Sequence, residues 1–163
     1  IGPLGSDFKE EMSDEKCVVI GGGIGVPPML GISDMFENVD AILGFRSAEN
    51  AILISDFNEN CNNVFLTSDD GTIGYHGFVT DVLKDKIEQY EVVFACGPKP
   101  MLKAVADIAK QNSKPCFVSL EERMGCGIGA CLVCACKTKE KDGEHYRHVC
   151  KDGPIFNAEE VEW

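Results

Sequence analysis

The sequence lacks any apolar run long enough to cross a membrane. Its longest runs, such as CVVI from Cys17 and EVVFAC from Glu91, are the length of a β-strand. A membrane-spanning helix needs about 20 apolar residues. The first sixteen residues also contain no apolar stretch of the length found in signal peptides. We therefore expect neither a membrane segment nor a secretory leader.

Basic residues are also scarce. Fifteen Lys and Arg residues face 27 Asp and Glu residues, which gives a net charge of −12. Such a polyanion repels nucleic acids and anionic lipid surfaces, so both classes of partner are excluded. A disulfide framework is not expected either, because the nine cysteines are odd in number and unevenly spaced. They fit a cytoplasmic protein in which some cysteines hold a metal.

Strand-like and helix-like segments alternate along most of the chain. Strands are expected over 17–20, 39–45, 63–68 and 91–96, with a fifth in PCFVSLEE (115–122). Helices are expected over about 27–36, 49–57, 78–90 and 97–111. This alternation predicts an α/β fold with a parallel sheet, right-handed crossovers and a ligand crevice at the carboxyl ends of the strands.

A glycine-rich segment with four cysteines, ERMGCGIGACLVCAC (122–136), interrupts this pattern. Cys126, Cys131 and Cys134 have the spacing C-x4-C-x2-C, and Cys150 follows after fifteen intervening residues. The first three match the spacing of plant-type [2Fe–2S] ferredoxins. Thiolates are soft ligands that suit iron, and glycines let the backbone wrap closely around a bulky cluster with its N–H groups toward the sulfurs.

Two alternatives to an iron–sulfur cluster stay open at this point. The first is structural zinc, which also takes four thiolates, although zinc sites usually pair two short cysteine knuckles, and here Cys150 stands alone. The second is a role for these cysteines that involves no metal. Cys136 is an extra cysteine two residues beyond Cys134, and we interpret it as a thiol packed in the interior.

The segment IGGGIGVPP (20–28) follows a strand and opens a helix, which is the context of a phosphate-binding turn. Gly21 and Gly23 fit the dinucleotide fingerprint, but Val26 stands where its third glycine would be. The second strand is followed by Arg46 and not by an acidic residue. An ordinary tight turn therefore remains possible here. Two further glycine turns, at 67–74 and 96–101, follow strands at the same sheet edge and favour a dinucleotide crevice.

Taken together, these motifs resemble the pyridine-nucleotide half of the ferredoxin–NADP reductase superfamily. Within it, the sequence is most similar to the electron-transfer subunits of NAD-dependent dihydroorotate dehydrogenases of type 1B. The resemblance rests on GPLG, GGGIGVPP, TSDDGTIGYHGFVT, CGPKPML and EERMGCGIGACLVCAC, together with Cys150. It covers nearly the whole chain, and the order of the motifs is more specific than any one of them.

The resemblance implies an oxidoreductase subunit that relays electrons between NAD(H), FAD and a [2Fe–2S] cluster. Its partner would be a catalytic subunit that contains FMN, in a hetero-oligomer that oxidises dihydroorotate for pyrimidine biosynthesis. The family carries a β-barrel for FAD before the glycine turn, and GPLG resembles the exit from that barrel. Residues 1–16 would then be a linker, 17–122 an NAD-binding domain and 123–163 a cluster-binding domain. Without the barrel, this piece would bind FAD poorly and be inactive alone.

The same resemblance assigns roles to individual residues. The pyrophosphate would lie against Gly21, Gly22, Gly23, Ile24, Gly25 and Pro27. The adenosine end would lie near Arg46, Asp69, Asp70 and Gly71, where an arginine would also admit NADP. The nicotinamide would be bordered by Cys96, Gly97, Pro98 and Met101, with Glu122 at the flavin or nicotinamide edge. The cluster ligands would be Cys126, Cys131, Cys134 and Cys150.

No general acid or base is identified, because the cofactors themselves carry hydride chemistry. Two alternative functions remain. One is another NAD(P)-linked iron–sulfur flavoprotein subunit, of sulfhydrogenase or transhydrogenase type. The other is a nucleotide-binding module that is stabilised by a structural zinc ion and has no redox role.

Overall fold

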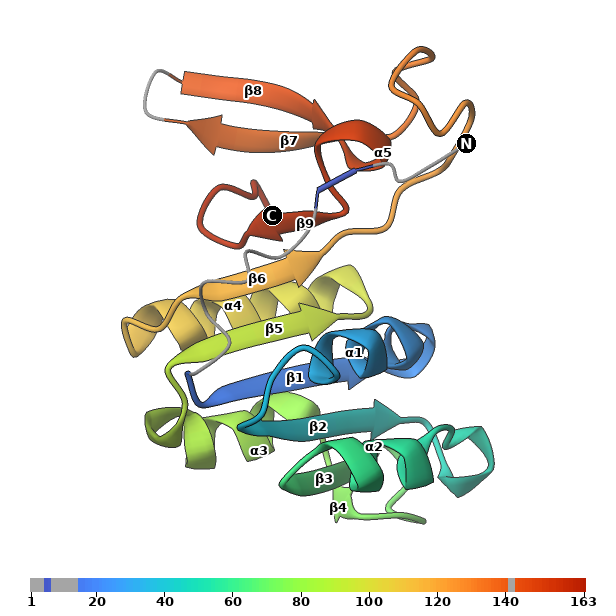
Figure 1. Cartoon of the computed structure of the whole chain (residues 1–163), viewed down its shortest axis with the longest axis vertical. Coiled ribbons are helices and arrows are strands. Elements are labelled where there is room, and N and C mark those ends of the chain that lie inside the picture. The colour runs from blue at the N-terminus through green and yellow to red at the C-terminus, as the bar shows by residue number, and fades with distance from the viewer. Residues whose placement is uncertain (1–4, 7–14, 141–142) are drawn as a thin grey trace.

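The computed structural model describes residues 5–6, 15–140 and 143–163, and its central element is a β-sheet (Figure 1). Within these residues the sheet has seven strands in the order β4-β3-β2-β1-β5-β6-β9. Every neighbouring pair is parallel apart from β6 and β9. The strands are β1 (Cys17–Gly22), β2 (Val39–Phe45), β3 (Asn63–Ser68), β4 (Tyr75–His76), β5 (Val92–Cys96), β6 (Cys116–Ser119) and β9 (Ile155–Asn157).

Helices cover both faces of this sheet (Figure 1). One face packs against α1 (Val26–Ser33) and α2 (Ile54–Asn60), and the other against α3 (Val79–Lys86) and α4 (Lys99–Gln111). Successive residues of β1 point to opposite faces, so Val18 belongs to one hydrophobic cluster and Val19 to the other. Burial on both faces explains why β1 has a continuous apolar sequence.

The predicted parallel sheet is confirmed, and the main differences lie at the ends of helices. α1 ends at Ser33, before the expected limit near 36, and a 3₁₀ turn (Gly23–Gly25) precedes it. The helix expected over 49–57 is divided into a 3₁₀ turn (Ala48–Asn50) and α2. The reason is Leu53, whose φ of 57° places it in the left-handed region and delays the start of α2 to Ile54.

The C-terminal part contains regular structure that the sequence did not predict. β7 (Ala135–Glu140) and β8 (Gly143–His148) form an antiparallel hairpin, followed by the short α5 (Val149–Asp152) and then β9. On β7 the buried positions are Cys136 and Thr138, which are small and weakly apolar. Because those inward-facing residues are not large hydrophobes, the alternation of the strand was not evident.

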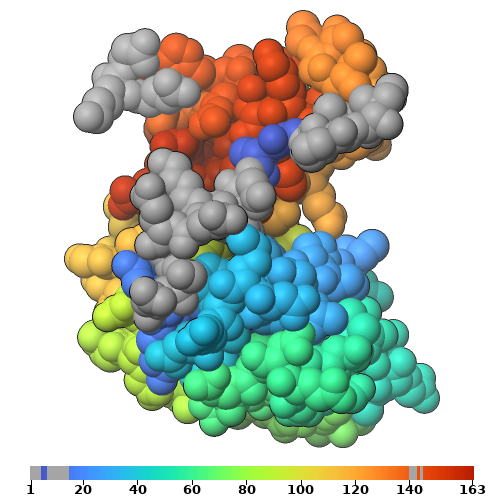
Figure 2. All heavy atoms as spheres, in the orientation of Figure 1, coloured from blue at the N-terminus to red at the C-terminus, as the bar shows by residue number. Residues whose placement is uncertain are grey.

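The described residues of this C-terminal part share a hydrophobic core with the rest of the chain. Val149, Phe156 and Val161 belong to the same hydrophobic cluster as Leu102 of α4 and Val118 of β6. In Figure 2 the orange and red C-terminal residues form an upper lobe that stands on the rest of the molecule. The expected boundary between two domains at residue 122 remains a prediction. β9, which follows this boundary in the chain, pairs with β6 and so extends the sheet formed by the residues before it.

The expected linker over 1–16 falls mostly outside the described residues. Of its described members, Ser6 donates its N–H to the carbonyl of Gly153 and its hydroxyl to the carbonyl of Ile155, the latter at 3.2 Å. Residues 5–6 therefore lie beside the segment between α5 and β9. Among the helices of the described residues, none is both long and apolar enough to cross a membrane.

Candidate functional site

A crevice of about 860 Å³ opens at the carboxyl ends of the parallel strands. The chain order of the sheet reverses between β1 and β5, and ligands of open α/β sheets bind at such a switch point. One end of the crevice is formed by Gly22–Ile24 after β1 and by Pro98 and Met101 after β5. Its volume lies within the range of small-molecule and cofactor sites.

The glycine turn after β1 forms the floor at this end. Gly23 has a φ of +54°, and a Cβ atom placed there would meet no atom of the protein within 4 Å. A side chain at this position would therefore stand in the crevice itself. Pro27 and Pro28 occupy the first turn of α1 and carry no N–H, so the amides available to an anion are those of the preceding turn.

Three of the predicted nucleotide residues lie behind the crevice wall. A Cβ on Gly25 would lie 2.6 Å from the N atom of Gly97 and closer still to the carbonyl of Cys96. A Cβ on Gly21 would lie 2.9 Å from the Cα of Val26. Cys96 is buried, and burial raises the pKa of its thiol. Gly25 and Cys96 hold the turns after β1 and β5 together, and Gly21 packs against the start of α1. None of the three lines the crevice.

The other end of the crevice lies at the carboxyl ends of β2 and β3. Arg46 and Asp69 line it there and are its only charged lining residues within the described part of the chain. Sequence reasoning missed Ile52 and Phe78, which also line it and are 44% and 65% exposed. Their sequence signal is weak, since each is a single apolar residue just outside a regular element. Such exposed apolar side chains at a crevice suit a flat apolar ligand surface.

Asp70 and Gly71 are close in sequence to this end but do not line it. The Asp70 carboxylate accepts hydrogen bonds from the Thr72 hydroxyl at 2.6 Å and from the Thr72 N–H at 3.0 Å. These bonds lower the pKa of Asp70. Thr72 in turn accepts the N–H of Ala48 at 2.8 Å. The aspartate thus stabilises the turn between β3 and β4, which Thr72 connects by a hydrogen bond to the segment after β2.

The cysteine loop, which we define as residues 122–134, directs backbone N–H groups at sulfur atoms. Cys126 Sγ accepts hydrogen bonds from Ile128, Ala130 and Cys131 at 3.4, 3.2 and 3.3 Å. Cys131 Sγ accepts the N–H of Cys126 at 3.3 Å, and Cys150 Sγ accepts the N–H of Gly129 at 3.1 Å. Preorganised amide dipoles of this kind stabilise negative charge on sulfur.

The four predicted ligands lie in two pairs, which differ in their electrostatics. Cys126 hydrogen-bonds with Cys131, and the N–H donors lower the pKa of its thiol to about 6. Cys134 hydrogen-bonds with Cys150 and, with burial, raises the pKa of the Cys150 thiol. A binuclear iron cluster takes two thiolates on each iron, whereas tetrahedral zinc takes four donors on one ion. The two pairs match the two thiolates that each iron of such a cluster takes, although within the described residues no three metal-ligating side chains stand together as a preformed metal site.

Cys136 lies outside this arrangement. Its thiol on β7 is buried and donates a hydrogen bond to the carbonyl of Arg147 at 3.4 Å. Burial raises its pKa. This cysteine therefore has the environment of a packed interior thiol.

Glu122 is exposed and lies at a second, smaller cavity of about 140 Å³, between the turn after β5 and the C-terminal part. Gly97 and Pro98 line the same cavity, and Pro98 also lines the large crevice. The cysteine loop lies on the side of the molecule toward which β1, β5 and β6 point (Figure 1). The crevice and the cysteine loop thus share one side of the protein.

Comparison with known proteins agrees with this geometry. Residues 121–162 match the family described as the iron–sulfur cluster binding domain of dihydroorotate dehydrogenase B. The whole chain also resembles a solved structure of an NADH-dependent reduced ferredoxin–NADP oxidoreductase that performs flavin-based electron bifurcation. That match has a TM-score of 0.83 and 28% identity, and covers 100% of this chain and 59% of the other.

Two curated relatives bear the name dihydroorotate dehydrogenase B (NAD⁺), electron transfer subunit. The protein from Caldanaerobacter subterraneus subsp. tengcongensis is 40% identical over 160 residues, which is 98% of this chain. The protein from Bacillus velezensis is 41% identical over 170 residues, which is 99% of this chain. The chain spans 64% of the length of each. It is therefore homologous, over nearly all of its length, to the electron-transfer subunits of NAD-dependent dihydroorotate dehydrogenase B.

Proposed function

We propose that this chain is the nucleotide- and cluster-binding part of such an electron-transfer subunit. In this role it relays electrons between NAD(H), FAD and a [2Fe–2S] cluster, and connects the FMN catalytic subunit of dihydroorotate dehydrogenase to NAD⁺ in pyrimidine biosynthesis. The observation that carries the proposal is the cysteine loop, in which five backbone N–H groups point at three of the four cysteine sulfurs.

In this proposal Cys126 and Cys131 would hold one iron, and Cys134 and Cys150 would hold the other. The amides of the cysteine loop would stabilise the negative charge on the sulfurs, and burial of Cys134 would exclude water from one side. When bound, the cluster carries one electron at a time, whereas FAD also exchanges hydride with a nicotinamide. FAD would be held mainly by a segment outside this sequence.

The nucleotide would lie along the crevice from the turn after β5 to the ends of β2 and β3. The pyrophosphate would meet the amides near Gly23, where a glycine leaves room for it. The adenine would lie between Ile52 and Phe78, which offer apolar surface, with Arg46 near the ribose. Pro98 and Met101 would border the nicotinamide at the opposite end, on the side toward Glu122.

The partner subunit would dock over the cysteine loop. Four large apolar side chains of the loop are more than half exposed: Met124, Ile128, Leu132 and Val133. Large exposed apolar patches mark sites of interaction with other proteins. Leu132 also has a φ of 61°, a backbone conformation that costs a non-glycine residue energy. This apolar face fits a protein partner that approaches the cluster closely.

A cytoplasmic location is part of the same proposal. All nine cysteines are free thiols in the structure, and several are buried without a partner cysteine. Free thiols in such number suit a reducing compartment.

The test is a Cys131→Ser variant of the chain, with Cys136→Ser as the matched control. The wild-type chain and the control, purified without oxygen, should contain stoichiometric iron and sulfide and give the visible and EPR spectra of a [2Fe–2S] cluster. Cys131→Ser should lose those spectra, because one iron loses a thiolate. A colourless wild-type chain that contains zinc would refute the redox function, and an intact spectrum in Cys131→Ser would refute the ligand assignment.

A second candidate is an NAD(P)-linked iron–sulfur flavoprotein subunit of a different oxidoreductase. The likeness to the NADH-dependent reduced ferredoxin–NADP oxidoreductase over 100% of this chain favours it. The two candidates differ in the partner. The full-length protein should co-purify with an FMN protein that oxidises dihydroorotate if the first is right, and with another redox enzyme if the second is right.

A further inference from the structure

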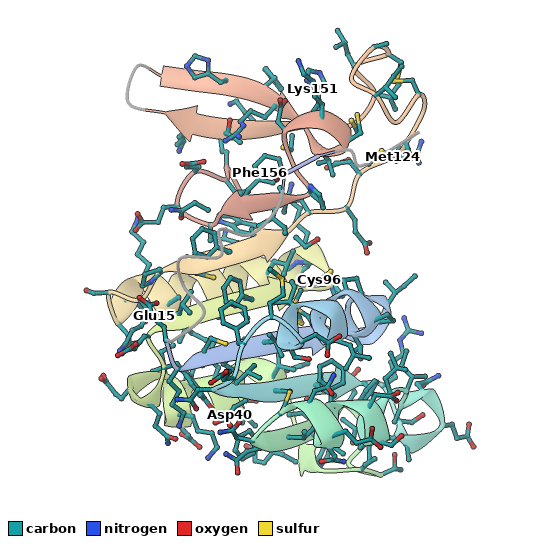
Figure 3. The ribbon with its side chains drawn as sticks, in the orientation of Figure 1. Glu15, Asp40, Cys96, Met124, Lys151 and Phe156 are labelled. Carbon is teal, nitrogen blue, oxygen red and sulfur yellow. The ribbon has the colours of Figure 1, made fainter. Side chains whose placement is uncertain are left out.

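The side chain of Lys151, in α5, lies across the cysteine loop. A Cβ atom placed on Gly129 would lie 3.2 Å from Lys151 Cβ, 3.5 Å from Cγ and 2.9 Å from Cδ. The aliphatic stem of Lys151 therefore covers the residue whose N–H donates to Cys150 Sγ at 3.1 Å. Lys151 is labelled in Figure 3, at the end of the molecule that carries the loop.

The charge of this lysine is not neutralised within the part of the chain whose side chains the structure describes. Lys137 and Arg147 nearby form ion pairs with Glu162 and Glu160 at 2.8 and 3.1 Å. The neighbouring Asp152 accepts the N–H of His148 at 2.8 Å. Lys151 is exposed and has no carboxylate within ion-pair distance among those residues. A cation thus remains beside the loop in a chain of net charge −12.

We propose that the Lys151 ammonium raises the reduction potential of the cluster bound by the cysteine loop. The proposal rests on the function proposed above, since it requires the cluster. Reduction adds one electron, supplied by the flavin in the proposed relay, and makes the cluster more negative by one charge without breaking a bond. Lys151 follows Cys150 directly in the chain, and its ammonium lies two bonds beyond the Cδ atom that packs over Gly129. Charges within about 10 Å of each other still interact at 0.1 M salt. The ammonium therefore stabilises the reduced form more than the oxidised form.

The expected size of the shift in the cluster's midpoint potential follows from the exposure of Lys151. A solvated charge at this distance is partly screened, so its removal should lower the ratio of reduced to oxidised cluster at a fixed potential by about two- to tenfold. Tenfold corresponds to about 59 mV for a one-electron couple. The shift in midpoint potential should be toward more negative values, and should shrink as the salt concentration rises.

The experiment is an anaerobic redox titration of the cluster-loaded chain, followed by EPR and visible absorption. Lys151→Met keeps most of the stem and removes the charge, whereas Lys151→Arg keeps the charge. Lys84→Met is the control, because this substitution changes the net charge by the same amount as Lys151→Met. Lys84 is exposed on α3, away from the cysteine loop. Lys151→Met should have a more negative midpoint potential, while Lys151→Arg and Lys84→Met should titrate like the wild-type chain.

Equal potentials in Lys151→Met and the wild-type chain would overturn the proposal. Equal shifts of the midpoint potential in Lys151→Met and Lys151→Arg would also overturn it. The cause would then be the way in which the side chain covers Gly129, and not its charge. Cluster content, measured as iron per chain, must stay unchanged in all variants for the comparison to support an electrostatic role. Absence of a cluster from the wild-type chain would instead refute the proposed function itself.

Discussion

Gly25 is the point at which the glycine turn after β1 touches the turn after β5, and its replacement by alanine gives a quantitative test of the crevice. The added Cβ would lie 2.6 Å from the N atom of Gly97 and closer still to the carbonyl group of Cys96. All of these are backbone atoms. Backbone cannot rotate away as a side chain can. The two turns must therefore separate, and we expect Gly25→Ala to widen and distort the nucleotide crevice.

Overpacking of this kind costs about 1–3 kcal/mol. For a chain of 163 residues, each kcal/mol corresponds to a shift of about 2–4 °C in Tm. Gly25→Ala should thus lower Tm by roughly 2–12 °C, on the basis of the same principles. Both displaced turns border the end of the crevice where we place the pyrophosphate and the nicotinamide. NADH affinity should therefore fall as well, by about tenfold for a loss of 1.4 kcal/mol in binding free energy.

The matched control is Gly31→Ala in α1. A Cβ there would meet no atom within 4 Å, and the residue lies in a helix, where alanine is favoured over glycine by about 0.5–1 kcal/mol. Gly31→Ala should be slightly more stable than the wild-type chain and bind NADH equally. The assays are urea denaturation followed by circular dichroism and isothermal titration with NADH. If Gly25→Ala and Gly31→Ala behave alike in both, the close contact between the two turns does not exist.

Three more predictions concern separate parts of the chain. Phe78→Ala should weaken binding of NADH about five- to 150-fold, from a base-stacking energy of about 1–3 kcal/mol. It should leave binding of reduced nicotinamide mononucleotide unchanged, and equal losses for the two ligands would contradict the adenine position. Tyr90→Phe should destabilise the fold by about 1–3 kcal/mol in urea denaturation, because its hydroxyl donates to the buried carboxylate of Asp40 at 3.0 Å; a difference below the error of the measurement would contradict this. In the cluster-free chain at pH 7, iodoacetamide should modify Cys126, whose pKa of about 6 makes it mostly thiolate. Cys17 should not react, since burial raises its pKa to about 12, and mass spectrometry showing the reverse order would refute these environments.

The sequence predicted the sheet well because its central strands are buried on both faces. Such strands are mostly apolar, and the segment at 39–45 was recognised with its full bounds. The segment at 63–68 was also recognised with its full bounds, from the apolar run Val64, Phe65 and Leu66 between polar ends, although its first four residues are exposed or half-buried. The hairpin of β7 and β8 was missed for the opposite reason. Its buried positions carry Cys136 and Thr138, which do not form a strong hydrophobic pattern, and the Asp-Gly pair at 142–143 was the only strong turn signal.

The candidate site was predictable where spacing along the chain determines chemistry. The C-x4-C-x2-C spacing and the distant Cys150 indicated a cluster from sequence alone, and the glycine turn indicated phosphate binding. Gly21, Gly25 and Cys96 were assigned to the nucleotide, yet the structure places them behind the crevice. Gly25 and Cys96 fix the contact between two turns there, and Gly21 packs against Val26 at the start of α1. Their role depends on which backbone segments meet, and sequence spacing carries no information about that.

The sequence by itself thus determined the α/β class, and it predicted four sulfur ligands and a phosphate-binding turn, because these depend on local periodicity and on short spacings. Tertiary structure alone decided how segments distant in the chain come together. It placed Ile52 and Phe78 in one crevice, joined β9 to the edge of the sheet and laid Lys151 over Gly129. The physical reason is that burial and charge interactions depend on distances in space, which only the packed fold sets.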